Sequence, residues 1–138
     1  MAADVACDLA AAGGAGIITP DLIPEEAGEW TEASERHGLD RIFLVAPSST
    51  PERISVVTSA CSGFVYTAST MGVTGTRGSV GSAASDLVRR VRPATDLPLC
   101  VGLGVSNGTQ AAEVASFADG VIVGSALVST LLDRGPED

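Results

Sequence analysis

The chain has 138 residues, which is the length of one domain, and its formal net charge is −9. Hydrophobic residues make up 45% and charged residues 18% of the sequence, so an intrinsically disordered acidic protein is excluded. All eight cations are arginine, which excludes a Schiff-base or phosphate-binding lysine, and the acidic balance argues against nucleic acid as a partner. We therefore expect a single domain over residues 1–138 that binds no nucleic acid.

The cysteine and histidine content indicates the cellular compartment and limits the possible metal chemistry. Cys7, Cys61 and Cys100 are widely spaced and odd in number, which fits neither a disulfide framework nor a CxxC metal site. His37 is the only histidine, so the sequence offers too few suitable residues for a His-ligated zinc site or a Ser-His-Asp triad. No segment reaches the roughly 18 apolar residues of a membrane span, and no secretory signal opens the chain. We expect a cytoplasmic chain with no metal and no membrane contact.

Helices and strands alternate along the sequence. In chain order, a helix over residues 4–12 precedes a strand over 15–19, and a helix over 24–37 follows it, since proline favours the first turn and Gly38 the end. The remaining predicted elements are a strand at 41–46, a helix at 51–60 capped by Thr50, a strand at 63–67, a helix at 82–91, a strand at 99–103, a helix at 109–117, a strand at 120–123 and a helix at 125–132. The polar residues 133–138 are expected to fray.

This alternation predicts βαβ units and a parallel sheet, in either a doubly wound fold or part of a βα barrel. Residues 19–24 contain no glycine, so the Rossmann fingerprint is missing after the first strand. Glycines cluster instead after the last three strands, where barrels build phosphate sites. A full barrel has eight strands, and this sequence offers five. The fold class predicted is α/β, a partial TIM barrel.

Two short glycine motifs follow the last two predicted strands. In the run from Gly102 to Ser106, two glycines let the backbone approach an anion and offer its N–H groups, although a plain tight turn explains them equally well. Gly124 and Ser125 stand where the last helix begins, and Ser125 either binds a phosphate or caps the helix. Taken together with Gly104, they favour a phosphate site made by two loops.

Three further features are candidates with simpler alternatives. The loop over residues 69–78 has three glycines and several hydroxyls, which is typical of a lid or binding loop but also of a surface connection. Tyr66 ends a strand and points either into a pocket or into the core. Asp21 follows the first strand, where it lines the active face or forms an Asx turn.

The order of five motifs resembles the tryptophan synthase α subunit family, in the form found in actinobacteria, over residues 10–132. The motifs are Pro20-Asp-Leu-Ile-Pro-Glu-Glu26, Phe43-Leu-Val-Ala-Pro47, Ser69-Thr-Met-Gly-Val-Thr-Gly75, Gly102-Leu-Gly-Val-Ser106 and Ile122-Val-Gly-Ser-Ala126. The resemblance implies strands four to eight of a TIM barrel. It also implies a carbon–carbon lyase that cleaves indole-3-glycerol phosphate to indole and glyceraldehyde 3-phosphate in tryptophan biosynthesis.

The resemblance assigns expected roles to individual residues. The substrate phosphate is held by Gly75, Gly104, Gly124 and Ser125. Thr74 supports the catalytic loop, Tyr66 lies beside the indole, Leu103 and Ile122 line the apolar pocket, and Asp21 is a structural carboxylate near the β-subunit face. Many members have Arg where Thr70 stands, which changes the loop contacts. The chain needs no cofactor of its own, because pyridoxal phosphate belongs to the partner β subunit.

The acid/base glutamate and the indole-binding aspartate of the family match no residue here, so we expect the isolated chain to be inactive. The alternative function is a non-catalytic half barrel that binds phosphate or a partner. Another phosphate-binding barrel, such as a relative from histidine biosynthesis, fits the run from Gly72 to Gly75 less well. Open sheet edges at 15–19 and 120–123 predict self-association or a molten monomer.

Overall fold

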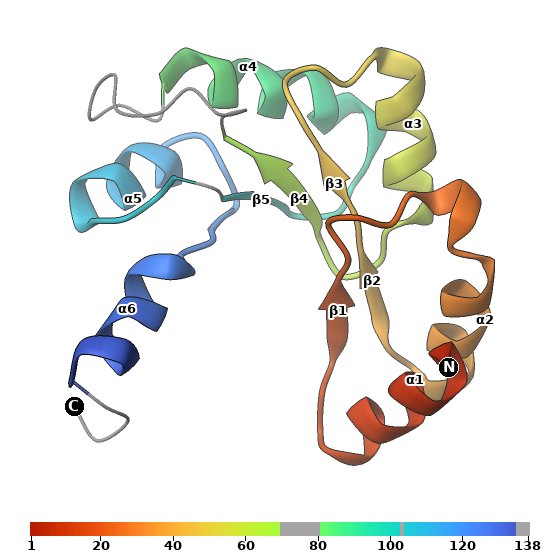
Figure 1. Cartoon of the computed structure of the whole chain (residues 1–138). Coiled ribbons are helices and arrows are strands. Elements are labelled where there is room, and N and C mark those ends of the chain that lie inside the picture. Colours follow the sequence, from red (N-terminus) through yellow and green to blue (C-terminus); the bar gives the residue numbers. More distant parts are fainter. Residues whose placement is uncertain (70–80, 103, 135–138) are drawn as a thin grey trace.

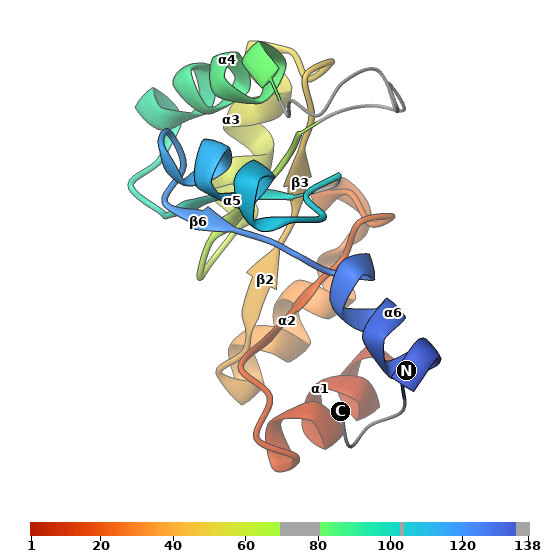
Figure 2. The same cartoon turned by 90° about the vertical axis from the view of Figure 1, so that its left-hand side faces the viewer.

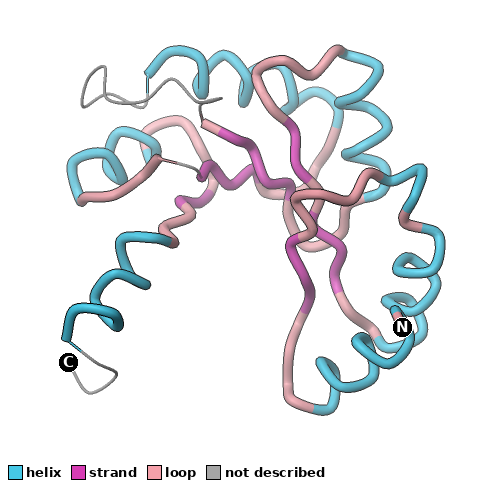
Figure 3. Tube along the Cα trace, viewed as in Figure 1, coloured by secondary structure: helices cyan, strands magenta, loops and turns pink. Residues whose placement is uncertain are grey.

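The computed structural model describes residues 1–69, 81–102 and 104–134. The strands form an inner, curved layer and the helices an outer arc around it (Figures 1 and 3). The helices are α1 (Ala2–Ala11), α2 (Gly28–His37), α3 (Pro51–Ala60), α4 (Gly81–Val91), α5 (Gly108–Ala115) and α6 (Ser125–Arg134), with 3-10 turns η1 (Pro24–Glu26) and η2 (Arg92–Ala94). The strands are β1 (Gly16–Ile18), β2 (Asp40–Ile42), β3 (Leu44–Val45), β4 (Val65–Ala68), β5 (Leu99–Gly102) and β6 (Gly120–Val121).

Every described strand pair is parallel, and the strands stand in the order in which they occur along the chain. Only Phe43 separates β2 from β3, and its carbonyl oxygen accepts a hydrogen bond from the Tyr66 N–H at 3.2 Å. The two segments are therefore one strand, and the sheet has five strands, as predicted. The α/β half-barrel fold is confirmed.

The two faces of the sheet differ in what covers them. Phe43, Val45, Val65, Leu99 and Val101 belong to the main apolar core and are at most 1% exposed. They point outward, toward the helices. Alternation along the strands then turns the following side chains to the concave face: Ile18, Ile42, Leu44, Tyr66, Cys100 and Ile122. Ile18 and Leu44 therefore face the concave side, whereas Ile17, Phe43 and Val101 pack in or against the core under the helices.

The prediction of one helix over 24–37 is wrong, because η1 and α2 are separate. Ala27 adopts φ −98° and ψ 18°, which is not helical, and its side chain is 1% exposed. The chain turns there to bury Ala27, and Gly28, a poor helix former, begins α2. The predicted end is confirmed: Gly38 takes φ +67°. The cap of α3 is also as predicted, with the Thr50 hydroxyl oxygen accepting from the Arg53 N–H at 3.2 Å.

Arginine side chains tie the helices to the strand ends. Arg41 of β2 donates to the Ser34 hydroxyl at 2.9 Å and to the Ala60 carbonyl at 3.2 Å, which joins the strand to α2 and to the end of α3. Arg90 of α4 donates to the carbonyls of Pro47 and Ser49, at 3.3 and 2.5 Å. These bonds fix the loop after β3 against α4.

Asp119, just before β6, accepts hydrogen bonds from the Leu99 N–H at 2.9 Å and from Arg92 at 3.0 Å. The Leu99 N–H, followed by Arg92, holds the pKa of this carboxyl below its usual value. Its contribution to stability is therefore present above the unfolded pKa, near 3.9, and is lost as the pH falls through the lower folded pKa. Since the carboxylate is partly exposed, we expect Asp119→Asn to cost about 0.5 kcal/mol at pH 7 and less at pH 3. Urea unfolding at the two pH values measures this, and an equal cost at both would contradict it.

The two ends of the fold are sparsely covered. In α6, Leu127, Val128, Leu131 and Leu132 are 62%, 53%, 54% and 80% exposed, and the helix points away from the sheet (Figures 1 and 2). The helix α6 ends at Arg134, two residues beyond the predicted end at 132. Fraying of residues 133–138 stays a prediction, and residues 135–138 lie outside the described residues. None of the described helices is both long and apolar enough to cross a membrane.

Candidate functional site

The carboxyl ends of β4 and β5 are fastened to one another. The Ser69 N–H, directly after β4, donates to the Gly102 carbonyl at 2.8 Å. Two residues earlier, the Thr67 hydroxyl donates to the Cys100 carbonyl at 2.7 Å. Ser69 is fully buried, and Thr67 is 1% exposed. Ser69 is therefore held firmly against the end of β5.

The turn after β5 contains Gly104, one of the glycines predicted to bind the phosphate. Gly104 takes φ +91°, a conformation that side chains other than glycine rarely adopt. The next helix, α5, starts only at Gly108. Its cap is internal, because the Asn107 side-chain oxygen accepts from the Gln110 N–H at 2.9 Å and the Gln110 side chain accepts from the Ser106 N–H at 2.8 Å. Some of the backbone N–H groups at the start of α5 are therefore already used in hydrogen bonds within the turn.

The start of α6 is more open. The Gly124 carbonyl accepts from the N–H groups of Leu127 and Val128, at 2.9 and 3.0 Å. The N–H groups of Ser125 and Ala126 precede these first intrahelical bonds, so they point beyond the helix end. A Cβ on Gly124 would meet nothing within 4 Å. The Gly124 Cα therefore borders open space at the start of α6.

The two predicted glycine turns follow neighbouring strands of the sheet. Val101 pairs with Val121 in the β5–β6 register. Gly104 and Gly124 come after the carboxyl ends of these two strands. The predicted residues Gly104, Gly124 and Ser125 therefore follow the same ends of adjacent strands.

Tyr66 and Ile122 meet over a third glycine. A Cβ on Gly102 would lie 2.7 Å from the Tyr66 Cζ and 2.9 Å from the Ile122 Cβ, so only glycine leaves room for both. Tyr66 is 8% exposed on the concave face. Gly102 is the residue whose role the sequence analysis missed. The sequence contains one signal for this role. Gly102 lies at the end of a predicted strand, and the neighbouring predicted strand contains the aromatic residue Tyr66.

The remaining predicted residues divide into two groups. Thr74, Gly75 and Leu103, like Thr70, lie outside the described residues. Asp21 is exposed in the turn after β1, at the carboxyl end of the sheet, where the Leu22 N–H donates to the Thr19 carbonyl at 3.4 Å. Asp21 therefore stands at the edge of the concave face.

The thiols are unpaired, and two of them have perturbed acidities. Burial raises the pKa of Cys61, whose sulfur accepts from the Phe43 N–H at 3.3 Å. Burial, with a smaller effect of Asp119, raises the pKa of Cys100, which faces Gly120. Both stay protonated at neutral pH, so neither is an activated nucleophile. Among the described residues no three His, Cys, Asp or Glu side chains are placed to hold a metal ion.

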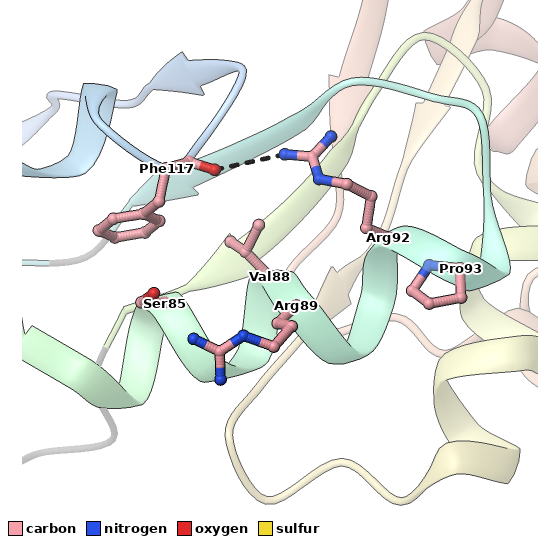
Figure 4. Close-up of a pocket in the computed structure, with 6 residues that line it drawn as sticks. All are labelled: Ser85, Val88, Arg89, Arg92, Pro93 and Phe117. Carbon is pink, nitrogen blue, oxygen red and sulfur yellow. Dashed lines mark hydrogen bonds between the residues drawn. The ribbon is translucent and has the colours of Figure 1, made fainter.

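A cavity of about 560 Å³ lies in the helix layer (Figure 4). Val88 and Phe117 form its apolar walls, and Arg92 crosses one side, where it donates to the Phe117 carbonyl at 3.3 Å. The cavity belongs to α4, η2 and the turn after α5, not to the concave face. It is therefore separate from the strand-end glycines.

Comparison with known proteins agrees with this architecture. The family model described as tryptophan synthase alpha chain matches residues 3–137. The tryptophan synthase alpha chain of Mycobacterium avium is 67% identical over 128 residues, which is 93% of this chain and 47% of the relative. That of Streptomyces avermitilis is 65% identical over 130 residues, or 94% of this chain and 47% of the relative.

Solved structures give the same result. A structure of Mycobacterium tuberculosis tryptophan synthase has a TM-score of 0.88 and 60% identity, covering 99% of this chain and 52% of that one. A Pyrococcus furiosus structure, described as the tryptophan synthase a2b2 complex, has a TM-score of 0.86 and 34% identity, covering 98% and 55%.

The parallel strands and the outer helices define part of a TIM-barrel protein. The chain belongs to the tryptophan synthase alpha chain family. It spans about half the length of the curated relatives that it matches.

Proposed function

We propose that this chain forms the phosphate-holding and indole-facing half of a lyase site that cleaves indole-3-glycerol phosphate to indole and glyceraldehyde 3-phosphate. The observation that supports the proposal is that Gly104 and Gly124 follow the carboxyl ends of the neighbouring strands β5 and β6, in a chain that belongs to this family. Backbone N–H groups at these turns and at Ser125 bind the phosphate, together with Gly75 of the loop after β4. Tyr66, Ile122 and Leu103 form the apolar wall beside the indole, and Thr74 supports the loop.

The reacting groups lie elsewhere in this proposal. Cleavage needs an acid that protonates the indole ring carbon and a base that accepts the glycerol hydroxyl proton. Among the described residues of the concave face, Tyr66, Cys100 and Ile122 carry no carboxylate. In this proposal the acid and the base come from the half of the relatives that this chain does not span, and the isolated chain is not a catalyst.

The partners and the compartment follow from the family. The Pyrococcus furiosus relative is described as an a2b2 complex, so the partner of this chain in the same arrangement is a β subunit. Pyridoxal phosphate belongs to that subunit, and this chain takes no cofactor. The unpaired Cys7, Cys61 and Cys100 favour a reducing compartment, which is the cytoplasm. Without other chains, the open edges at β1 and β6 lead to self-association.

The phosphate site is tested by titration of the chain with inorganic phosphate or glycerol 3-phosphate, followed by NMR of the backbone amides. We expect weak binding, about millimolar for so small a ligand, with shifts at Gly104 and Ser125. Gly124→Val fills the space in front of α6 and should weaken binding at least about tenfold. Gly28→Val is the matched control, since a Cβ there also meets nothing within 4 Å and lies on α2. Equal shifts in all three proteins would refute the phosphate site.

A further inference from the structure

The cavity in the helix layer, of about 560 Å³, has a volume typical of sites that bind small organic molecules. Its described lining residues come from α4, from η2 and from the turn after α5: Ser85, Val88, Arg89, Arg92, Pro93 and Phe117. None of these residues belongs to the concave face or to the glycine turns that follow β5 and β6. A ligand of this cavity is therefore bound apart from the proposed lyase site.

The walls of the cavity are apolar and fixed by the core. Val88 is 3% exposed and belongs to the main core, and Phe117 packs against that core. Figure 4 shows the Phe117 ring and Ser85 at one end of the cavity and Arg92 at the other, with Val88 between them. An apolar group of a ligand therefore fits beside Val88, where a flat ring can stack on the ring of Phe117.

Of the described lining residues, two are arginine and none is acidic, in a chain that has 17 acidic residues and eight cations. Arg92 is held in place, because it donates to the Phe117 carbonyl at 3.3 Å and to the Asp119 carboxylate at 3.0 Å. A guanidinium group has five N–H donors, so these two bonds leave others available. Arg92 therefore offers a ligand donors whose position is already set.

The second cation, Arg89, is free to change its partner. It pairs with Asp86 at 2.8 Å, but the two side chains are 74% and 60% exposed. An exposed pair of this kind contributes little to stability, because water screens it and both side chains lose conformational freedom. A carboxylate on a ligand can therefore share or replace Asp86 at small cost. Carboxylate oxygens match the planar fork of a guanidinium group, so two arginines at one cavity favour this kind of anion.

We propose that this cavity binds a small aromatic carboxylate, with its ring between Phe117 and Val88 and its carboxylate on Arg89 and Arg92. Ser85 and Arg92 are seven residues apart, about two turns of helix, so a single ring joined to a carboxylate by a short linker spans the cavity. An inorganic anion would leave the apolar walls uncovered, and a neutral hydrocarbon would leave the arginines unused. The inference does not depend on the proposed lyase function.

The probe is hydrocinnamate, which has one ring, a linker of two methylene groups and a carboxylate. Titration calorimetry and NMR of the whole chain should give a dissociation constant of about 0.1–1 mM, with shifts at Ser85, Val88 and Phe117. Hydrocinnamamide keeps the shape without the charge, and acetate keeps the charge without the ring, so each should bind at least about tenfold more weakly. Equal binding of either control would refute the ligand class. Shifts confined to Gly104 and Ser125, or no shifts, would refute the site.

Variants test the charge and the space separately. Arg89→Gln should weaken hydrocinnamate binding about tenfold, because one of the two guanidinium groups is lost. Arg36→Gln is the matched control: it removes the same charge from an exposed position on α2 and should change the affinity by less than about twofold. Ser85→Leu fills one end of the cavity and should weaken binding at least about tenfold. Circular dichroism verifies the fold of each variant. Equal affinities of Arg89→Gln and Arg36→Gln, or unchanged affinity of a folded Ser85→Leu, would overturn the proposal.

Discussion

The isolated chain is expected to release no measurable indole from indole-3-glycerol phosphate. Acid and base groups each contribute about 10² to 10⁴ in rate, so a site without both should be at least about 10⁴-fold slower than a complete one. Phosphate binding at Gly104 and Gly124 holds the substrate in the ground state and the transition state alike, and uniform binding of this kind does not replace the missing proton transfers. Indole appearance under saturating substrate measures the rate.

The full-length alpha chain of Mycobacterium avium is the positive control in the same assay. A rate from the isolated chain close to that control would contradict the prediction. It would require a substitute acid at the edge of the concave face, where Asp21 is exposed. Asp21→Asn would then abolish the rate, whereas it leaves an inactive chain unchanged.

A methyl group at Gly102 is expected to destabilise the fold by about 1–3 kcal/mol, the usual cost of overpacking. The new Cβ would lie 2.7 Å from the Tyr66 Cζ and 2.9 Å from the Ile122 Cβ. The backbone of β5 has little freedom to yield, since it is paired with β4 on one side and β6 on the other. Urea unfolding of Gly102→Ala measures the loss.

Two further variants make this experiment specific. Tyr66→Leu removes the phenol carbon and oxygen that the methyl group meets, so the double variant should lose less stability than the sum of the single variants. Gly108→Ala is the matched control, because a Cβ there meets nothing within 4 Å and Gly108 starts α5. A cost for Gly102→Ala no larger than that of Gly108→Ala would show that Tyr66 is not packed on β5.

The positions of the strands and helices were predictable because their ends carry local signals. Thr50 and Pro51 start α3, and Gly38 ends α2, through hydrogen bonds and dihedral angles that those residues favour by themselves. The break at Ala27 was not predictable from the local preference of that residue, since alanine is a strong helix former and its burial depends on the tertiary structure. The hydrogen bonds of Arg41 were likewise not predictable, because its partners Ser34 and Ala60 belong to two different helices.

The face of the sheet toward which each strand residue points could not be predicted from the sequence. Strands buried on both sides are apolar at every position, so the runs around Phe43 and Val101 contain no alternation that separates the concave face from the outer one. The site was more accessible to sequence reasoning. Gly104 and Gly124 stand at the ends of adjacent predicted strands, whereas the role of Gly102 depends on the ring of Tyr66, which comes from the neighbouring strand 36 residues earlier.

The sheet order has a kinetic consequence. Each strand pairs only with strands that adjoin it in sequence: Gly16 with Asp40, Leu44 with Tyr66, Tyr66 with Cys100 and Cys100 with Gly120, over separations of 24, 22, 34 and 20 residues. The contact of greatest separation in a closed barrel, between its first and last strands, does not arise within this sheet. The loop-closure cost is therefore similar at every step, and the chain can acquire its strands one after another as they leave the ribosome.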